Sequence, residues 1–385
     1  MRHSTRRGIA AAAFGLSAVL VLAACSGGGG GTGGDGTDAP ADELTQVKLQ
    51  LQWLPQAQFA GYFAAADQGF FEEEGLEVEI VPSGGDIVPQ DALANGDADF
   101  AIAWVPKVLG SIEAGANVTD IAQIFQRSGT LQVSWADSGI DSVADFEGKR
   151  IGSWGFGNEW EIFAAMAAEG LDSTSVQIIT QDFNMNAFLQ GDIDAAQAMT
   201  YNEWAQLLES VNPDTGELYQ PSDFTVISYE DTVGAMLQDA IWADTERLES
   251  DAAYADTAVA FLKAVIKGWI FAADNPEQAA EITLAAGSGW GPSHELWMTN
   301  ETNKLIWPSD AGIGIIDEAA WNRTVEGALS AVNETGARLI TAEPPATAYT
   351  NEYIQKALDE LESEGLDLTG ANFTPITVEL QEGGN

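Results

Sequence analysis

The chain has 385 residues and a formal net charge of −44, because 59 acidic residues stand against 15 basic ones. An electrostatic field of that sign repels nucleic acids and anionic lipids, so neither is expected as a partner. One cysteine and two histidines exclude an internal disulfide and a histidine-rich metal site, and we expect no metal or cofactor. The length exceeds that of one ordinary hydrophobic core, so two lobes are expected.

Residues 1–24 have the pattern of a bacterial lipoprotein signal peptide. Three arginines precede an apolar run at residues 9–22, which is shorter than the roughly 20 residues that span a bilayer. The run ends in Leu-Ala-Ala-Cys, which predicts cleavage before Cys25 and a diacylglycerol anchor on its sulfur. The alternative is a plain secretory signal followed by a coincidental cysteine. Residues 25–44 then form a lipidated, glycine-rich tether, which places the protein on the outer face of the cell membrane.

Two later stretches, residues 47–104 and 148–199, follow one order of predicted elements. Each begins with a strand that ends in tryptophan, and continues with a helix, a second strand, a helix, the motif Gly-Asp-x-Asp and a third strand. Gly96 and Gly191 stand where a helix end needs a left-handed residue. Strands alternating with helices predict parallel pairing with right-handed crossovers. The alternative is a chance similarity between two ordinary α/β units.

The ends of these strands predict a shared ligand site. In open parallel sheets, ligands bind beyond the carboxyl ends of the strands. Trp53 and Trp154 end the first strand of each stretch, Trp104 ends a third strand, and Tyr201 and Asn202 follow the other third strand. If the two sheets face each other, these side chains line one cleft.

The rest of the chain is predicted to be mostly helical. Residues 256–272 have an amphipathic pattern, and Asn275-Pro276 is typical of a helix start. His294 is expected to be an ordinary surface residue. The Gly-Asp-x-Asp motifs are interpreted as helix ends with exposed carboxylates rather than as a catalytic pair.

Five segments carry a resemblance to a known family. The segments are LQWLPQAQFAGYFAAADQGFFEEEGLEVEIV (51–81), GDADFAIAW (96–104), FEGKRIGSWGFGNEW (146–160), AMTYNEWAQ (198–206) and MTNETNKLIWPS (298–309). In these segments the chain resembles the extracytoplasmic solute-binding proteins of ABC importers, and within them the branch that binds thiamine pyrimidine precursors.

The resemblance implies an α/β fold of the periplasmic-binding-protein type (type II). It would be a two-lobed monomeric clamp, with a mostly parallel sheet flanked by helices in each lobe. Lobe 1 would comprise residues 45–135 and 236–385 with the C-terminal helices, and lobe 2 residues 136–235. Closure around a ligand would be recognised by an ABC permease. A receptor without a transport role remains an alternative.

The same superfamily contains eukaryotic enzymes of pyrimidine synthesis, which the resemblance associates with a cysteine-rich iron motif and a sacrificial histidine. Here the one cysteine is Cys25, and no histidine lies between His3 and His294. The sequence therefore favours a binding protein over an enzyme, and no catalytic residue is predicted.

Aromatic and amide side chains are the candidate ligand contacts, because a flat heteroaromatic ring needs stacking faces and a few polar partners. The alternative for each tryptophan is packing in a lobe core, and it is disfavoured for Trp53. Tyr62 has the spacing of a core residue, and the alternative for Glu159 is a favourable charge at a helix start. The predicted contacts are Trp53, Gln56, Gln58, Tyr62, Trp104, Trp154, Asn158, Glu159, Tyr201, Asn202 and Glu203.

The scarcity of basic residues near the predicted cleft indicates the charge of the ligand. Phosphate sites need arginine, lysine or dense backbone donors. Near the cleft only Lys107, Arg127, Lys149 and Arg150 are available. This disfavours a phosphorylated ligand and, for the same reason, nitrate or a sulfonate, although these stay open. An aminopyrimidine or a larger ring such as riboflavin fits the carboxylates and aromatics.

Overall fold

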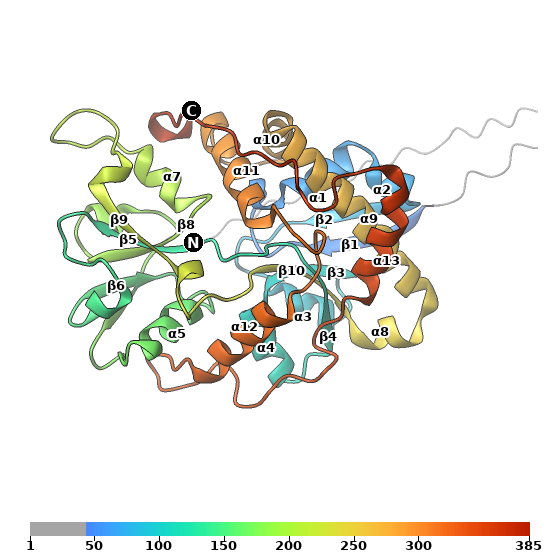
Figure 1. The fold of residues 1–385 in the computed structure, drawn as a ribbon, viewed down its shortest axis with the longest axis horizontal. Helices are drawn as coiled ribbons and strands as arrows, with labels where there is room; N and C mark the ends of the chain where they lie inside the picture. The colour runs from blue at the N-terminus through green and yellow to red at the C-terminus, as the bar shows by residue number, and fades with distance from the viewer. Residues whose placement is uncertain (1–43) are drawn as a thin grey trace, which may run out of the picture. The chain divides into compact units, whose positions relative to one another are not determined.

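The computed structural model describes residues 44–385, which form two five-stranded sheets flanked by helices (Figure 1). The first sheet has the order β2-β1-β3-β10-β4 and the second the order β7-β6-β8-β5-β9. The strands of the first sheet are β1 (Thr45–Gln50), β2 (Leu76–Val81), β3 (Phe100–Trp104), β4 (Val118–Gln123) and β10 (Asp239–Asp244). Those of the second are β5 (Thr130–Trp135), β6 (Arg150–Ser153), β7 (Gln177–Thr180), β8 (Ala195–Met199) and β9 (Phe224–Ser228).

The two stretches of sequence that share one order of elements supply the parallel part of each sheet. In the first sheet β1 pairs in parallel with β2 and β3, and in the second β6 pairs in parallel with β7 and β8. The expectation of mostly parallel sheets is confirmed, since four of the five strands in each sheet run in one direction, while β10 and β5 run antiparallel to both of their neighbours. Each sheet is mixed because each of these two strands belongs to a segment that crosses between the sheets.

The two segments that cross between the sheets lie next to each other. The backbone amides of Ile124 and Phe125 donate to the carbonyl of Asp239, at 3.2 and 3.1 Å. The Gln238 amide accepts from the backbone N–H of Gly129 at 2.8 Å and donates to Glu161 at 3.1 Å. The segment that leaves the first sheet is thus hydrogen-bonded to the segment that returns to it.

The boundaries of the two lobes stay a prediction, with one correction. β5 pairs with β8 and β9 in the second sheet, whereas the boundary predicted after residue 135 assigned this strand to the first lobe. The sequence does not mark the crossing, since β5 follows β4 after a short connection and has the same apolar character.

The helices follow one another along the chain in the order that the sequence predicts. The helix predicted at residues 256–272 lies within α9, which begins after Asp251, whose carboxylate accepts from two backbone N–H groups of the first turn. The helices are α1 (Ala60–Asp67), α2 (Phe70–Glu73), α3 (Pro89–Ala94), α4 (Val105–Glu113), α5 (Trp160–Ala168), α6 (Asn186–Leu189), α7 (Glu203–Leu208), α8 (Thr245–Ser250), α9 (Ala252–Asp274), α10 (Pro276–Ala285), α11 (Pro292–Ile306), α12 (Glu318–Ser330) and α13 (Glu352–Leu361). Short 3₁₀ helices are η1 (Ala57–Phe59), η2 (Val143–Phe146), η3 (Pro221–Asp223), η4 (Tyr229–Asp231), η5 (Glu362–Glu364) and η6 (Glu382–Gly384).

Close packing of α1 on α9 fixes the helix that follows the first strand. A Cβ atom on Gly268 would lie 2.0 Å from the carbonyl oxygen of Gly61, so the two backbones meet without side chains between them. Trp269 lies against Gly61, and its ring meets that of Tyr62 edge to face at 5.7 Å between centroids. This contact holds the start of α1, and with it the β1–α1 junction, in place.

The predicted glycine turns are confirmed. Gly96 and Gly191 have φ angles of 78° and 76°, one residue beyond the C-caps of α3 and α6. The predicted signal peptide, Cys25 and nearly all of the tether lie outside the described residues. Among residues 44–385, no helix combines the length and the apolar character that crossing a bilayer requires.

Candidate ligand-binding site

A cavity of about 540 Å³ lies where the carboxyl ends of β1, β3, β6 and β8 converge. We name two of its faces. The first-sheet wall comprises Gln52, Trp53, Gln56, Gln58, Trp104 and Lys107, and the second-sheet wall comprises Trp154, Phe156, Asn158, Phe183, Tyr201, Asn202 and Glu203. The remaining lining residues are Gly84, Gly85, Ile87, Val88, Pro89, Gln90, Gly157, Trp160, Met199 and Leu339.

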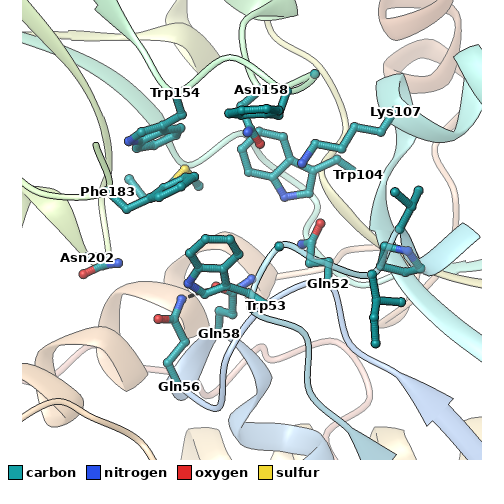
Figure 2. A pocket seen from close by; sticks show the side chains of 18 of the residues that line it. Gln52, Trp53, Gln56, Gln58, Trp104, Lys107, Trp154, Asn158, Phe183 and Asn202 are labelled. Atoms are coloured by element: carbon teal, nitrogen blue, oxygen red, sulfur yellow. Dashed lines mark hydrogen bonds between the residues drawn. The ribbon is translucent and has the colours of Figure 1, made fainter. Parts of the chain in front are cut away.

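Amide groups of the first-sheet wall are linked to one buried carboxylate. Gln52 donates its Nε2 to both oxygens of Asp239, and Gln58 donates to the same carboxylate at 3.4 Å. Gln58 in turn accepts from Gln56, which lies beside it in Figure 2. The side-chain oxygen of Gln56 accepts from the Trp290 indole at 3.4 Å. The β1–α1 junction is therefore tied by Gln52 and Gln58 to the first residue of β10, Asp239.

Burial shifts the ionisation of the charged groups beside this wall. The pKa of Asp239 rises to about 7, because loss of solvation outweighs the opposing effects of the Lys107 charge and of the donors Gln58 and Gln52. The pKa of Lys107 falls to about 8 through loss of solvation, against the attraction of Asp239 and Glu159. The Lys107 ammonium lies 5.2 Å from the centre of the Trp104 ring, a distance at which cation–π attraction acts.

The second-sheet wall begins with an unusual turn after β6. Gly155, Phe156 and Gly157 all have left-handed backbones, with φ angles of 68°, 55° and 89°. Glycine adopts this conformation freely, but in Phe156 it is strained. The Phe156 side chain is 88% exposed, although it also lines the cavity. Asn158 closes the turn by donating to the Gly155 carbonyl at 2.8 Å. The turn thus presents an aromatic ring at the cavity mouth.

Three aromatic rings extend from one wall to the other. The Phe183 ring lies 4.5 Å from that of Trp53, tilted by 52°, and 6.1 Å from that of Trp154, nearly parallel at 21°. Figure 2 shows Phe183 between the two tryptophans. Aromatic faces from both sheets thus meet in the cavity, an arrangement suited to a flat ring.

Polar groups that follow β8 complete the second-sheet wall. Glu203 accepts from the backbone N–H of Met199 at 3.0 Å and from the Asn202 amide at 3.3 Å. Its pKa rises to about 7, because burial penalises the carboxylate more than these hydrogen bonds favour it. Tyr201 is buried beside them, with its ring 6.2 Å from that of Phe125.

His294 is not a surface residue, which corrects the sequence-based expectation. The side chain is fully buried. Its Nδ1 contacts both oxygens of Glu209, at 3.0 and 2.9 Å, and its Nε2 lies 3.1 Å from Oδ1 of Asn202. The imidazole stacks on Trp290 at 4.1 Å. Through His294, helix α11 reaches the cavity residue Asn202. A lone histidine in a polar helix gives no sequence signal of such a contact.

The structure brings most of the predicted contact residues to the cavity. Trp53, Gln56, Gln58, Trp104, Trp154, Asn158, Tyr201, Asn202 and Glu203 all line it. Their role as ligand contacts stays a prediction. Tyr62 and Glu159 are not among the lining residues and are corrected here. Tyr62 packs in the core against Trp269, as its helical spacing allowed. Glu159 points into a separate hollow of about 260 Å³, where it accepts from the Gly157 amide at 2.9 Å.

Two lining residues escaped prediction although the sequence contains a signal for them. Phe183 follows β7, so it too lies beyond the carboxyl end of a parallel strand. Gln52 lies next to Trp53, beyond the last residue of β1, and so also lies past the carboxyl end of a parallel strand. Among residues 44–385, no group of three or more histidine, cysteine, aspartate or glutamate side chains is arranged to hold a metal ion.

Comparisons with known proteins agree with this architecture. The chain is 26% identical over 275 residues to the formylaminopyrimidine-binding protein of Halalkalibacterium halodurans, covering 70% of this chain and 76% of that one. It is 25% identical over 365 residues to the riboflavin-binding protein RibY of Chloroflexus aurantiacus, covering 88% and 96%. Among solved structures, the putative periplasmic sulfonate-binding protein SsuA of Methylobacillus flagellatus matches with a TM-score of 0.58 at 17% identity, covering 88% and 100%.

The structural match confirms the predicted fold, an α/β fold of the periplasmic-binding-protein type. At that identity, the likeness concerns the fold alone. The family model described as NMT1/THI5 like matches residues 56–279, which is more than half of the chain and includes most of the cavity. The chain therefore belongs to the NMT1/THI5-like family.

Proposed function

We propose that this protein is a lipid-anchored extracytoplasmic solute-binding protein of an ABC importer. Its ligand is a small planar heteroaromatic molecule, which we assign to the thiamine pyrimidine precursors of the hydroxymethylpyrimidine or formylaminopyrimidine type. The protein holds this ligand without transforming it and presents it to a permease in the membrane.

The aromatic cavity between the two sheets carries the proposal. Trp53 and Trp104 belong to the first-sheet wall, and Trp154 and Phe183 to the second-sheet wall. Flat faces on both sides favour an aromatic ring, which gains stacking energy as well as burial. A ligand gripped between two such walls also couples its binding to closure of the walls, which a permease can recognise.

The polar groups suit an amino-substituted ring. Glu203 lines one side of the cavity, and each of its carboxyl oxygens accepts one hydrogen bond from the protein, so an exocyclic amino group can donate to the lone pairs that are left. The amides of Gln56 and Gln58 on the other wall are neutral, so enclosing them costs less solvation free energy than enclosing ions would. A neutral aminopyrimidine matches both walls.

The relatives support the pyrimidine assignment and suggest its main alternative. The similarity to a formylaminopyrimidine-binding protein favours a pyrimidine. The similarity to RibY covers more of both chains, and a cavity of about 540 Å³ admits a larger ring system such as a flavin. Nitrate and sulfonates suit the cavity less well, because Lys107 is the one basic residue among its lining residues.

Catalysis of pyrimidine synthesis is the alternative of another class. The family resemblance associates that reaction with a cysteine-rich iron motif, whereas this sequence has one cysteine, Cys25. His294, which contacts the cavity residue Asn202, has one ring nitrogen against Glu209 and the other against Asn202. Formation of a phosphorylated pyrimidine by the purified protein would favour the enzyme.

Isothermal titration calorimetry of the purified protein tests the ligand. We expect saturable heat with an aminopyrimidine bearing a hydroxymethyl or formylaminomethyl group, and none with taurine or nitrate. Riboflavin serves as the competing ligand. Heat with riboflavin alone would identify the ligand as a flavin and leave the proposed binding between the two walls intact. Heat with none of these ligands would contradict the proposal.

The anchor and the transport role need separate tests. The proposed lipidation lies on Cys25, so Cys25→Ser should release the protein from the membrane into the medium, and mass spectrometry should detect diacylglycerol on the wild-type chain only. The discovery of permease and ATPase genes beside the gene for this protein would support import over a receptor without transport, and their absence would favour the receptor. Equal membrane retention of both forms would contradict the anchor.

A further inference from the structure

Lys107 differs from the two partly buried lysines of helix α9. Lys263 and Lys267 each contact a glutamate carboxylate, at 2.7 and 3.3 Å for the nearest pairs. Lys107 has no ion pair or hydrogen bond within residues 44–385, although the chain contains 59 acidic residues. The Lys107 side chain lines the cavity. A cation without a protein partner at such a place is available to a ligand.

The aliphatic part of Lys107 is held from both sheets. Its ammonium lies over the Trp104 ring, which belongs to the same wall. On the other side, a Cβ atom on Gly157 would come 3.2 Å from Lys107 Cγ, so the turn after β6 packs directly on the lysine stem. Figure 2 shows Lys107 beside Trp104 and near Asn158. The side chain is therefore fixed in direction by the turn of the second-sheet wall.

The side-chain amides around the cavity, unlike Lys107, already donate hydrogen bonds to acceptors within the protein. Gln52 donates to Asp239 and Gln56 to Gln58, while Asn158 donates to the Gly155 carbonyl. An ammonium carries three donors and no acceptor. Lys107 therefore supplies the strongest uncommitted donor group among these lining residues, and a ligand that enters must match it with an acceptor or leave it desolvated.

The opposite side of the cavity has the reverse polarity. The carboxyl group of Glu203 lines that side, where its two oxygens accept from Asn202 and Met199, and Figure 2 shows Asn202 and Lys107 on opposite sides of the aromatic rings. A ligand that spans the cavity then donates at one end, stacks in the middle and accepts at the other end. One ammonium near the carboxylates of Asp239 and Glu159 suits a neutral carbonyl oxygen better than a phosphate dianion.

We propose that Lys107 is a specificity-determining residue that binds a carbonyl oxygen on the ligand. The ligand class is then an amino-heteroaromatic ring that bears a formamide or a ring lactam, with its amino edge toward Glu203. This inference rests on the proposed function, which it narrows by separating carbonyl-bearing ligands from rings that lack a carbonyl.

Two ligands and three proteins test the assignment by calorimetry. The ligands are N-formyl-4-amino-5-aminomethyl-2-methylpyrimidine and 4-amino-2,5-dimethylpyrimidine, which share the ring and the amino group and differ in the formamide. The proteins are the wild type, Lys107→Met and Lys356→Met. Lys356 pairs with Glu352 on an exposed face of α13, so its loss makes the same change in net charge far from the cavity wall.

We expect Lys107→Met to weaken binding of the formyl ligand by about 10- to 100-fold, as for a hydrogen bond to a charged donor. Binding of the dimethylpyrimidine should change less than about threefold, and Lys356→Met should change neither. Riboflavin, which has lactam carbonyls, should follow the formyl ligand.

Equal weakening of both pyrimidines in Lys107→Met, or no weakening of either, would overturn the role of Lys107 while leaving the proposed function intact. A wild-type protein that binds neither pyrimidine but binds riboflavin with the same loss in Lys107→Met would support Lys107 and replace the pyrimidine. A wild-type protein that binds none of the three ligands would overturn the proposed function and this assignment together.

Discussion

The two walls of the cavity are built on different principles. In the first-sheet wall, Gln52 and Gln58 are tied to Asp239 at the start of β10, a strand inside the sheet. In the second-sheet wall, Phe156 and Phe183 come from loops and are 88% and 42% exposed. A hydrogen-bonded wall holds its polar groups in place before a ligand arrives, whereas exposed rings on loops are free to meet it. We infer that the first wall selects the ligand and the second covers it.

The largest difference between the two walls is expected when one tryptophan of each wall, Trp53 or Trp154, is replaced by alanine. Trp154 is 3% exposed and packs in the main core cluster, whereas Trp53 is half-buried at its edge. Trp154→Ala should lower the free energy of unfolding by about 3–5 kcal/mol. Trp53→Ala should cost less stability but weaken ligand binding by about 0.5–1.5 kcal/mol beyond the lost contact area. Urea denaturation and calorimetry measure the two quantities.

Two results would contradict this contrast between Trp53 and Trp154. If the two variants lose the same stability, Trp53 is as structural as Trp154, and the distinction between a stacking face and a core residue is wrong. An unchanged affinity in Trp53→Ala, measured on protein that remains folded, would place Trp53 outside the site.

The next effect concerns one carboxyl group at each wall. The pKa values of Asp239 and Glu203 are raised to about 7 by burial. Between about pH 4 and pH 7 the folded protein keeps these protons while the unfolded chain releases them, so the free energy of unfolding falls as pH rises through that window. Each group contributes at most about 4 kcal/mol. The unliganded protein should therefore be more resistant to urea at pH 5 than at pH 8.

Variants assign this pH dependence to its sources. Asp239→Asn and Glu203→Gln should each flatten the fall between pH 5 and pH 8, because an amide does not titrate. The part of the pH dependence that Asp239→Asn removes comes from the carboxyl group beside the first-sheet wall. The part that Glu203→Gln removes comes from the second-sheet wall. A slope in Asp239→Asn identical to that of the wild type would rule out its carboxyl as a source.

A smaller effect is expected where helix α11 joins the two walls. His294→Phe keeps the stacking on Trp290 but leaves Glu209 as a buried carboxylate without its partner. The loss of unfolding free energy should be about 2–3 kcal/mol. Glu209→Leu and the double variant complete a thermodynamic cycle, in which we expect a coupling energy of more than about 1 kcal/mol. Additive losses would show that the two side chains do not support each other.

The sequence predicted the parts of this site that depend on strand periodicity. Trp53, Trp104 and Trp154 were predicted at the cavity because each ends a parallel strand, and that rule depends on local pattern alone. The antiparallel direction of β5 and β10 was not predicted, since it follows from which sheet a crossing strand joins. Such a choice is made by contacts between segments far apart in the chain.

Contacts between distant residues also explain the failures at single positions. Tyr62 was assigned to the ligand although Trp269, more than two hundred residues later, takes it into the core. His294 was assigned to the surface although Glu209 and Asn202 enclose it from another element. The left-handed backbone of Phe156 was not foreseen either, because a phenylalanine between two glycines carries no sign of its own conformation.

Phe156 offers the smallest and most specific test of the second-sheet wall. Relief of its left-handed strain, at φ 55°, should make Phe156→Gly more stable than Phe156→Ala by about 1 kcal/mol, since alanine keeps the strain and both variants remove the ring. The exposed ring contributes little packing, so Phe156→Ala should match the wild type in thermal stability. If the ring covers the ligand, both variants lose affinity to the same extent. Affinity lost in Phe156→Gly alone would instead show that the shape of the turn, not the ring, holds this wall against the ligand.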